Sequence, residues 1–204
     1  VNTYHPLLDD AVANSIEVKN GFILTGSNMA GKSTFLRTLG LNSLLAQTLG
    51  YAHAEKFTVS FTNIVSIINK NDDLGSGESF YYYEANRIAG MINSSSQVNY
   101  LFLIDELLSG TNSIERVAAS IAIIKHLIKR KNIISCVATH DVSIARELEE
   151  TCRCYYFSDY IENGQMLFDY QLNQGIIKTT NAIRMLKVLG LPEEITGSAE
   201  KLVN

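Results

Sequence analysis

The stretch GFILTGSNMAGKST (residues 21–34) decides the fold class of this 204-residue chain. Its first part, FILTG (22–26), is an apolar run that predicts a buried strand. The residues from about 33 to 47 carry apolar side chains at helical spacing, and Gly50 follows them as a plausible end of the helix. A strand, a glycine-rich loop and a helix therefore follow one another directly.

The loop between them matches the phosphate-binding pattern G-x-x-x-x-G-K-[ST]. Gly26 and Gly31 allow backbone torsions that aim N–H groups at phosphate oxygens. Lys32 has the reach to contact the β- and γ-phosphates of a nucleotide, and the hydroxyl of Ser33 is a ligand for Mg²⁺. The alternative is a glycine turn before an ordinary helix, which the combination of strand, loop and helix disfavours.

Apolar runs and helical patterns alternate along the rest of the chain. We expect strands at 61–68, 99–105 and 133–140, and helices at 81–92, 113–129 and 144–150. This alternation predicts an α/β fold with three layers, α/β/α, around a largely parallel central sheet. Polar clusters lie where strands end, at residues 26–33, 105–106 and 139–140. Because such sheets bind ligands at the carboxyl ends of their strands, we expect one shared site.

Composition and charge limit the partners of the chain. Hydrophobic residues make up 46% and charged residues 19%, as is typical of a globular α/β protein. The net charge is -4, whereas a domain that itself holds DNA phosphates is usually basic. The sequence contains no signal peptide and no membrane-length apolar run, so we expect a cytoplasmic protein without a membrane partner. It begins with Val1 rather than Met, and we expect it to be part of a longer protein.

The three cysteines are Cys136, Cys152 and Cys154, an odd number without a paired framework. The Cys-x-Cys pair alone is weak evidence for a metal site, because no second pair or nearby His completes one. We therefore expect structural or incidental thiols in a reducing compartment.

The apolar strand LFLIDE (101–106) ends in two carboxylates. Asp105 suits Mg²⁺, directly or through water, and Glu106 suits polarisation of an attacking water. An acidic pair at a strand end is often a solvated loop, but the phosphate-binding loop favours the functional interpretation. Such a pair fits a hydrolase better than a kinase.

His140 ends the next apolar strand. A lone His at a strand end is often a hydrogen-bonded structural residue. Here it lies at the expected active edge, where it can sense a γ-phosphate or orient water.

The segment GSGES (75–79) precedes a predicted helix. It is either an anion site at that helix N-terminus or a flexible turn, and spacing alone does not decide. Tyr81, Tyr82 and Tyr83 point in three directions on a helix, and we expect them to be divided between core and interface.

Several motifs, in order along nearly the whole chain, resemble the ATPase domain of the MutS family. TGSNMAGKST (25–34) resembles its TGPNMGGKST, DDLGSGES (72–79) its DDLxxGxS, FLIDELLSGTNS (102–113) its LLDEIGRGTST and VATH (137–140) its FATH. His5-Pro6, VANSI (12–16) and LGLPEEI (189–195) resemble the opening HP, the nucleotide-flanking segment and the closing AGVPxxI stretch. A single phosphate-binding loop is common, whereas this ordered set is specific.

The resemblance implies a P-loop NTPase of the ABC type that binds ATP and Mg²⁺ and works as a homodimer around two nucleotides. The residues implied to surround the phosphates are Gly26, Ser27, Asn28, Met29, Ala30, Gly31, Lys32, Ser33 and Thr34. Ser33 and Asp105 are the implied Mg²⁺ residues. The implied catalytic residues are Glu106 at the water, His140 at the γ-phosphate, Asn28 and Lys32.

The resemblance also implies contacts beyond the phosphates. Ser79 matches a Ser that reaches the nucleotide of the opposite subunit. Asn112 and Ser113 lie in the loop that communicates across the interface. Tyr170 falls where many relatives carry a His that stacks on adenine, and a tyrosine ring can stack in the same way.

Some positions depart from the family pattern. Ser27 replaces a Pro, Ala30 a Gly and Ser109 an Arg. The FYYYEANRI stretch looks more like divergent bacterial relatives than like the mismatch-repair enzymes. The family's DNA-clamp domains have no counterpart in this sequence, so we expect residues 1–204 to be one ATPase domain of a MutS-like protein of DNA mismatch repair or recombination. DNA is then held by upstream domains.

Two other ATPase classes remain as alternatives. The nucleotide-binding subunit of an ABC transporter usually has LSGGQ immediately before the acidic strand, and GSGES lies earlier than that here. A chromosome-organising ATPase has a long coiled coil between the loop and the acidic strand, and the heptads that it needs do not occur in this sequence.

Overall fold

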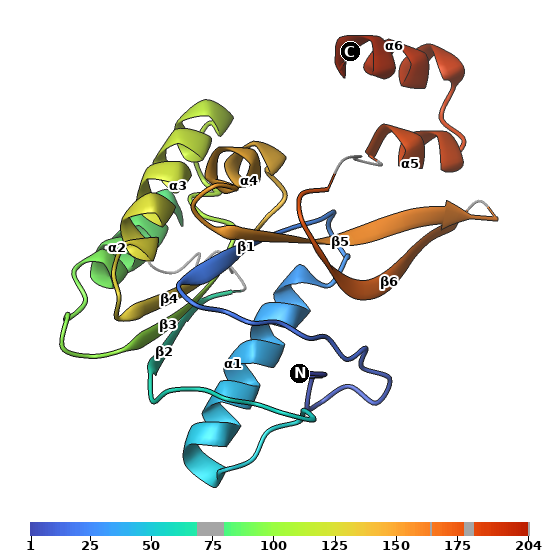
Figure 1. The fold of residues 1–204 in the computed structure, drawn as a ribbon. Coiled ribbons are helices and arrows are strands. Elements are labelled where there is room, and N and C mark those ends of the chain that lie inside the picture. Colours follow the sequence, from blue (N-terminus) through green and yellow to red (C-terminus); the bar gives the residue numbers. More distant parts are fainter. Residues whose placement is uncertain (69–79, 164, 178–181, 204) are drawn as a thin grey trace.

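The computed structural model describes residues 1–68, 80–163, 165–177 and 182–203. Six strands form one sheet in the order β2-β3-β4-β1-β5-β6 (Figure 1). Their bounds are β1 Gly21–Thr25, β2 Asn63–Ile67, β3 Tyr100–Asp105, β4 Ile133–Thr139, β5 Arg153–Glu162 and β6 Gln165–Gln174. The first five strands in this order run parallel to one another, and β6 is antiparallel to β5. The largely parallel sheet that the sequence predicts is confirmed.

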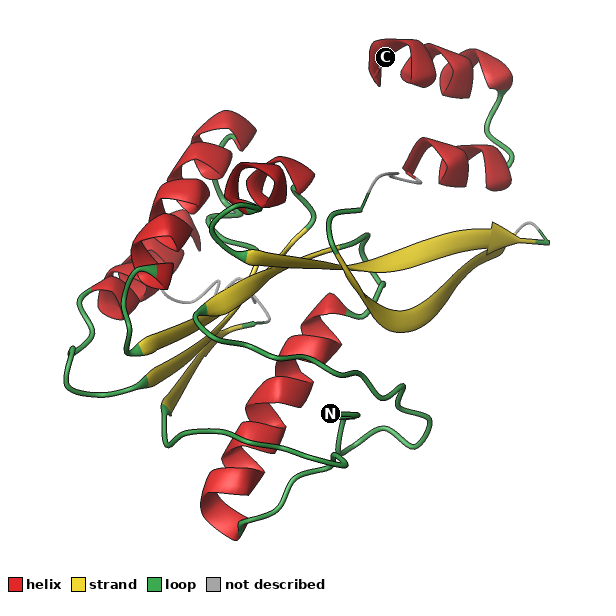
Figure 2. Ribbon diagram, viewed as in Figure 1, coloured by secondary structure: helices red, strands yellow, loops and turns green. Residues whose placement is uncertain are grey.

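Helices cover both faces of this sheet (Figures 1 and 2). One face carries α1 (Lys32–Leu49), and the other carries α2 (Phe80–Ile92), α3 (Ser113–Ile128) and α4 (Val142–Leu148). Two further helices, α5 (Ala182–Val188) and α6 (Glu193–Val203), pack against each other and stand apart from these layers. The predicted order of layers is therefore present.

Two apolar cores lie on the two faces because successive residues of a strand point to opposite sides. Phe22 and Leu24 of β1 pack with Leu36 of α1 in one core. Ile23, the residue between them, packs with Leu127 of α3 in the other. Burial on both faces explains why these strands read as continuous apolar runs.

Helix α1 lies very close to the sheet. A Cβ atom built on Gly40 would be 2.6 Å from Cδ1 of Leu103 in β3. A side chain at Gly40 would therefore collide with Leu103 unless the Leu103 side chain moved. Gly50 ends the helix in the left-handed conformation, as the sequence predicts.

The tyrosines of α2 correct one expectation. Tyr81, Tyr82 and Tyr83 are 42%, 54% and 54% exposed, so none of them enters the core. The buried side of α2 consists of Glu84, Ile88 and Met91, which recur at helical spacing.

Within the described ranges, no helix is long and apolar enough to cross a membrane.

Candidate functional site

A cavity of about 740 Å³ opens where β1 and β3 end. Ten of the residues singled out in the sequence line it: Ser27, Asn28, Met29, Gly31, Lys32, Ser33, Thr34, Asp105, Glu106 and Tyr170. The N-terminal segment lines it as well, through residues 5, 8–12 and 14. Parallel strands thus bring the loop and the acidic pair together as expected, while Ser79 lies outside the described residues.

The glycines of the loop are required by backbone conformation and by space. Gly26 has φ 149° and Gly31 has φ 100°, a region that L-residues rarely adopt. A Cβ on Gly26 would lie 2.9 Å from the carbonyl oxygen of Phe157, and one on Gly31 would lie 3.1 Å from Cδ1 of Tyr170. The loop is therefore pressed against β5 and β6.

The other loop residues divide between core and cavity. Ala30 is fully buried in the core below the loop, so its small side chain supports the loop from behind. Asn28 is exposed, and Met29 is 83% exposed with φ 73°. Both line the open side of the cavity.

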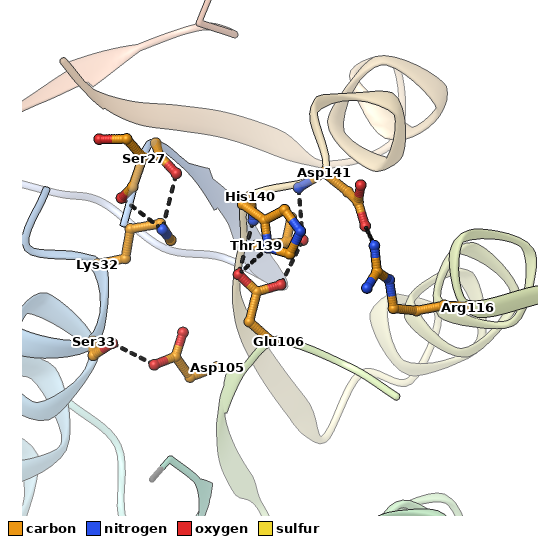
Figure 3. A network of polar contacts seen from close by, with 10 residues as sticks. Ser27, Lys32, Ser33, Asp105, Glu106, Arg116, Thr139, His140 and Asp141 are labelled. Atoms are coloured by element: carbon orange, nitrogen blue, oxygen red, sulfur yellow. Dashed lines mark hydrogen bonds and ion pairs between the residues drawn. The ribbon is translucent and has the colours of Figure 1, made fainter. Parts of the chain in front are cut away.

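Lys32 is the buried cation of the site, with 6% of its surface exposed. Its ammonium group donates hydrogen bonds to the carbonyl oxygens of Gly26 and Ser27, both at 2.9 Å (Figure 3). Burial lowers the pKa of Lys32, and the nearby carboxylates of Glu106 and Asp105 act in the opposite direction. The lysine is thus held at the loop by weak neutral acceptors, which an anionic phosphate can replace.

Ser33 and Asp105 form the second contact across the cavity. The Ser33 hydroxyl, in the first turn of α1, donates a hydrogen bond to the Asp105 carboxylate at the end of β3 (Figure 3). Hydroxyl and carboxylate oxygens are the hard donors that Mg²⁺ prefers, so this pair fits the metal. In the part of the chain that the structure describes, no three His, Cys, Asp or Glu side chains gather as a metal site. Phosphate and water oxygens would be suitable further ligands for Mg²⁺.

The Glu106 carboxylate is held by the end of β4 (Figure 3). The Thr139 hydroxyl donates to Oε2 at 3.1 Å, and the His140 backbone N–H donates to Oε1 at 2.9 Å. His140 Nδ1 lies 2.8 Å from Oε1, and because a carboxylate only accepts hydrogen bonds, the tautomer with its proton on Nδ1 fits this contact. His140 is not part of the cavity lining and reaches the site through Glu106.

Three residues that sequence reasoning did not select position the site. Arg116 of α3 forms an ion pair with Asp141 at 2.8 Å, and the Asp141 N–H donates to the Thr139 hydroxyl. Asn14, 8% exposed, donates to the Tyr170 carbonyl at 2.9 Å and accepts from the Leu172 N–H at 2.7 Å. VANSI contains Asn14 and was the only signal for any of them.

Tyr170 stands at the edge of the cavity in β6. Its φ is 53°, its side chain is 44% exposed, and its ring is stacked on Phe168 with centroids 5.9 Å apart. Because the ring lies close to Gly31, a planar base next to the loop would lie within its reach.

In the expected interface loop, Asn112 has a structural role, and the three cysteines are buried. Asn112 caps α3, since its side chain accepts hydrogen bonds from the N–H groups of Ile114 and Glu115. Cys136, Cys152 and Cys154 are buried free thiols. Burial raises the pKa of all three, to about 12 for Cys152 and about 11 for Cys154.

Comparison with known proteins identifies the family. The family described as MutS domain V matches residues 22–204. The DNA mismatch repair protein MutS of Pseudothermotoga lettingae is 32% identical over 223 residues, which cover 100% of this chain and 26% of that protein. MutS of Thermus aquaticus is 30% identical over a match that covers 98% of this chain and 25% of that protein. The Drosophila melanogaster DNA mismatch repair protein spellchecker 1 is 26% identical over a match that covers 98% of this chain and 23% of that protein.

The chain thus spans about a quarter of the length of these relatives. The match to the family domain, residues 22–204, includes the loop, the acidic strand end and β6. It therefore includes every wall of the cavity except the N-terminal segment. The chain belongs to the MutS family and corresponds to its domain V.

Proposed function

We propose that residues 1–204 are a P-loop NTPase of the ABC type, the ATPase domain of a MutS-like DNA mismatch repair or recombination protein. One observation carries this proposal. A loop lysine, a Ser–Asp pair suited to Mg²⁺ and a glutamate held by a histidine lie at a single cavity. The matched family domain, the ATPase domain of MutS proteins, supports the same function. It also favours this function over that of a transporter subunit or a chromosome-organising ATPase.

The loop binds the triphosphate of ATP. Backbone N–H groups of the loop would donate hydrogen bonds to its oxygens, with Asn28 at the γ-phosphate. Lys32 exchanges its bonds to the Gly26 and Ser27 carbonyls for bonds to phosphate oxygens, which are stronger because the acceptor is charged. Ser33 and Asp105 would hold Mg²⁺, which would supply positive charge against the charge that develops on the phosphates.

Glu106 acts on the attacking water. Its carboxylate accepts a proton from the water as the water oxygen attacks the γ-phosphorus. The bond from this phosphorus to the bridging β-phosphate oxygen breaks, and ADP leaves with that oxygen. Thr139 and His140 hold this carboxylate from one side through both of its oxygens. His140 thereby connects the γ-phosphate region to β4.

Two partners complete the proposal. Two copies enclose the nucleotides, with Ser79 of each copy at the nucleotide of the other, and Tyr170 stacks on adenine. DNA is bound by domains upstream of this one, and the relatives are named as DNA mismatch repair proteins. The net charge of -4 agrees with a domain that does not hold DNA by itself.

The test is ATP hydrolysis by the purified chain and by Glu106→Gln. The variant keeps the size of the side chain but removes the base, so we expect kcat to fall by about 10²-fold or more, with ATP affinity retained. Glu147→Gln is the matched control, because Glu147 is an exposed glutamate on α4, 56% accessible, paired with Lys125. Equal hydrolysis rates for the wild type and Glu106→Gln would refute the role of Glu106. A wild type that neither binds nor hydrolyses Mg–ATP would refute the function.

A further inference from the structure

A buried carboxylate outside the cavity lining reaches the segment that follows the hydrolytic glutamate. Glu84, in the second turn of α2, is 2% exposed. Its Oε1 accepts a hydrogen bond from the Leu108 N–H at 2.6 Å, and its Oε2 accepts one from the Ser109 N–H at 3.0 Å. Burying a carboxylate is costly unless donors compensate it, and here the donors are two consecutive backbone groups of another segment.

The segment that Glu84 holds has an unusual backbone. Glu106 has φ 59° and Leu108 has φ 54°, so two non-glycine residues close together adopt the left-handed conformation. Such residues persist only where the surroundings fix them. Leu107 and Leu108 are buried, and the Glu106 N–H donates to the Ala138 carbonyl.

The bonds from Glu84 fix the exit of this turn, as β4 fixes its entrance. The Glu106 N–H is anchored on β4, and the N–H groups two and three residues later are anchored on α2. The direction of the Glu106 carboxylate depends on the torsions between these anchors. Packing of α2 on the sheet alone does not require a carboxylate, since the apolar Ile88 and Met91 already occupy the buried side of the helix.

We propose that Glu84 is a positioning residue for ATP hydrolysis, which holds the turn at residues 106–109 so that Glu106 faces the reacting water. This inference rests on the proposed function. Glu84 does not touch the nucleotide. Its loss therefore lowers the rate of the chemical step and leaves nucleotide affinity unchanged.

The experiment measures kcat and KM for Mg–ATP with two conservative variants of the purified chain. Glu84→Gln keeps the length of the side chain and loses the charge, whereas Glu84→Asp keeps the charge and loses reach. We expect kcat to fall about tenfold in each, the effect of losing one charge-assisted hydrogen bond at the turn, with KM within about twofold of the wild type. Amide hydrogen exchange at Leu108 and Ser109 should become faster.

Asn42→Ala is the control for a loss of stability. The Asn42 side chain is fully buried in α1 and bonds to backbone groups of Tyr4, Thr38 and His53. This variant should lose stability and keep its kcat. If the Gln variant does not fold, the Asp variant carries the test.

Three results would overturn the proposal: an unchanged kcat, a kcat lowered equally by Asn42→Ala, or a rise in KM proportional to the loss in kcat. Each presupposes an active wild type. An inactive wild type would instead refute the proposed function.

Discussion

Asn14→Ala is expected to weaken ATP binding through the base and not through the phosphates. In the structure Asn14 joins the N-terminal segment to β6, with one bond to the Tyr170 carbonyl and one from the Leu172 N–H. Both bonds are partly buried, so each contributes about 1 kcal/mol and their loss lowers the free energy of unfolding by about 2 kcal/mol. Tyr170 also loses the contact that holds its left-handed backbone.

In the proposed function Tyr170 stacks on adenine, so the effect on affinity follows from the energy of that contact. An aromatic contact of this kind contributes about 1 kcal/mol, which corresponds to about a fivefold change in affinity. We therefore expect KM for ATP to rise about fivefold with kcat unchanged, because stacking acts equally on ground state and transition state. Inorganic tripolyphosphate lacks a base, so its inhibition constant should not change.

The assay is steady-state hydrolysis with tripolyphosphate as a competitor. Asn132→Ala is the matched control, because the Asn132 side chain, just before β4, also makes two hydrogen bonds, both of them donated to the carbonyl groups of Ser95 and Val98. Combining Asn14→Ala with Tyr170→Ala should add little to the single effects, since both remove the same contact. Equal weakening of ATP and tripolyphosphate would refute the reasoning, as would an unchanged KM in a folded variant.

Three further properties can be measured on the same chain. If two copies enclose the nucleotides, the ATPase rate per molecule should rise with protein concentration, and a constant rate from a chain that sedimentation shows to be monomeric would contradict this. The buried thiols should react slowly with a disulfide reagent at pH 8 and rapidly after unfolding, and equal rates would contradict their burial. Because the folded pKa values of Cys152 and Cys154, about 12 and about 11, lie above the unfolded value, the free energy of unfolding should fall as pH rises above about 9 in urea titrations.

The sheet and its polar edge could be predicted because they depend on short stretches of sequence. Three of the four predicted strands, β1, β3 and β4, are buried on both faces or nearly so, and continuous apolar runs mark such strands directly. The glycines of the loop could likewise be predicted, because the local backbone conformation requires them. Parallel strands then place the loop and the acidic pair at one edge without further information.

The β5–β6 hairpin was not predicted because its pattern is mixed. In β6 the side chains are partly exposed on both faces, so neither a continuous apolar run nor a strict alternation marks it. The Asn163–Gly164 pair in the sequence was an available signal, since Asn-Gly is the commonest two-residue hairpin connection.

The residues that position the site were missed for a different reason. Asn14 and Tyr170 are 156 residues apart, Arg116 and Asp141 are 25 apart, and Glu84 is 24 residues from Leu108. Each pair is defined by packing of elements on the sheet and has no local pattern. Such residues can be found only once the elements have been placed in space.

The charges of the cavity decide how a polyphosphate can enter it. Asp9, Asp10, Asp105 and Glu106 line the cavity with Lys32, so its carboxylates outnumber its permanent cation. A bare triphosphate would meet net repulsion at short range, and the loop dipoles alone would have to overcome it. A Mg²⁺ ion held by Ser33 and Asp105 would reverse that balance, because it would add two positive charges beside the carboxylates. In the proposed ATPase the Ser33–Asp105 pair therefore serves nucleotide binding as much as the chemical step.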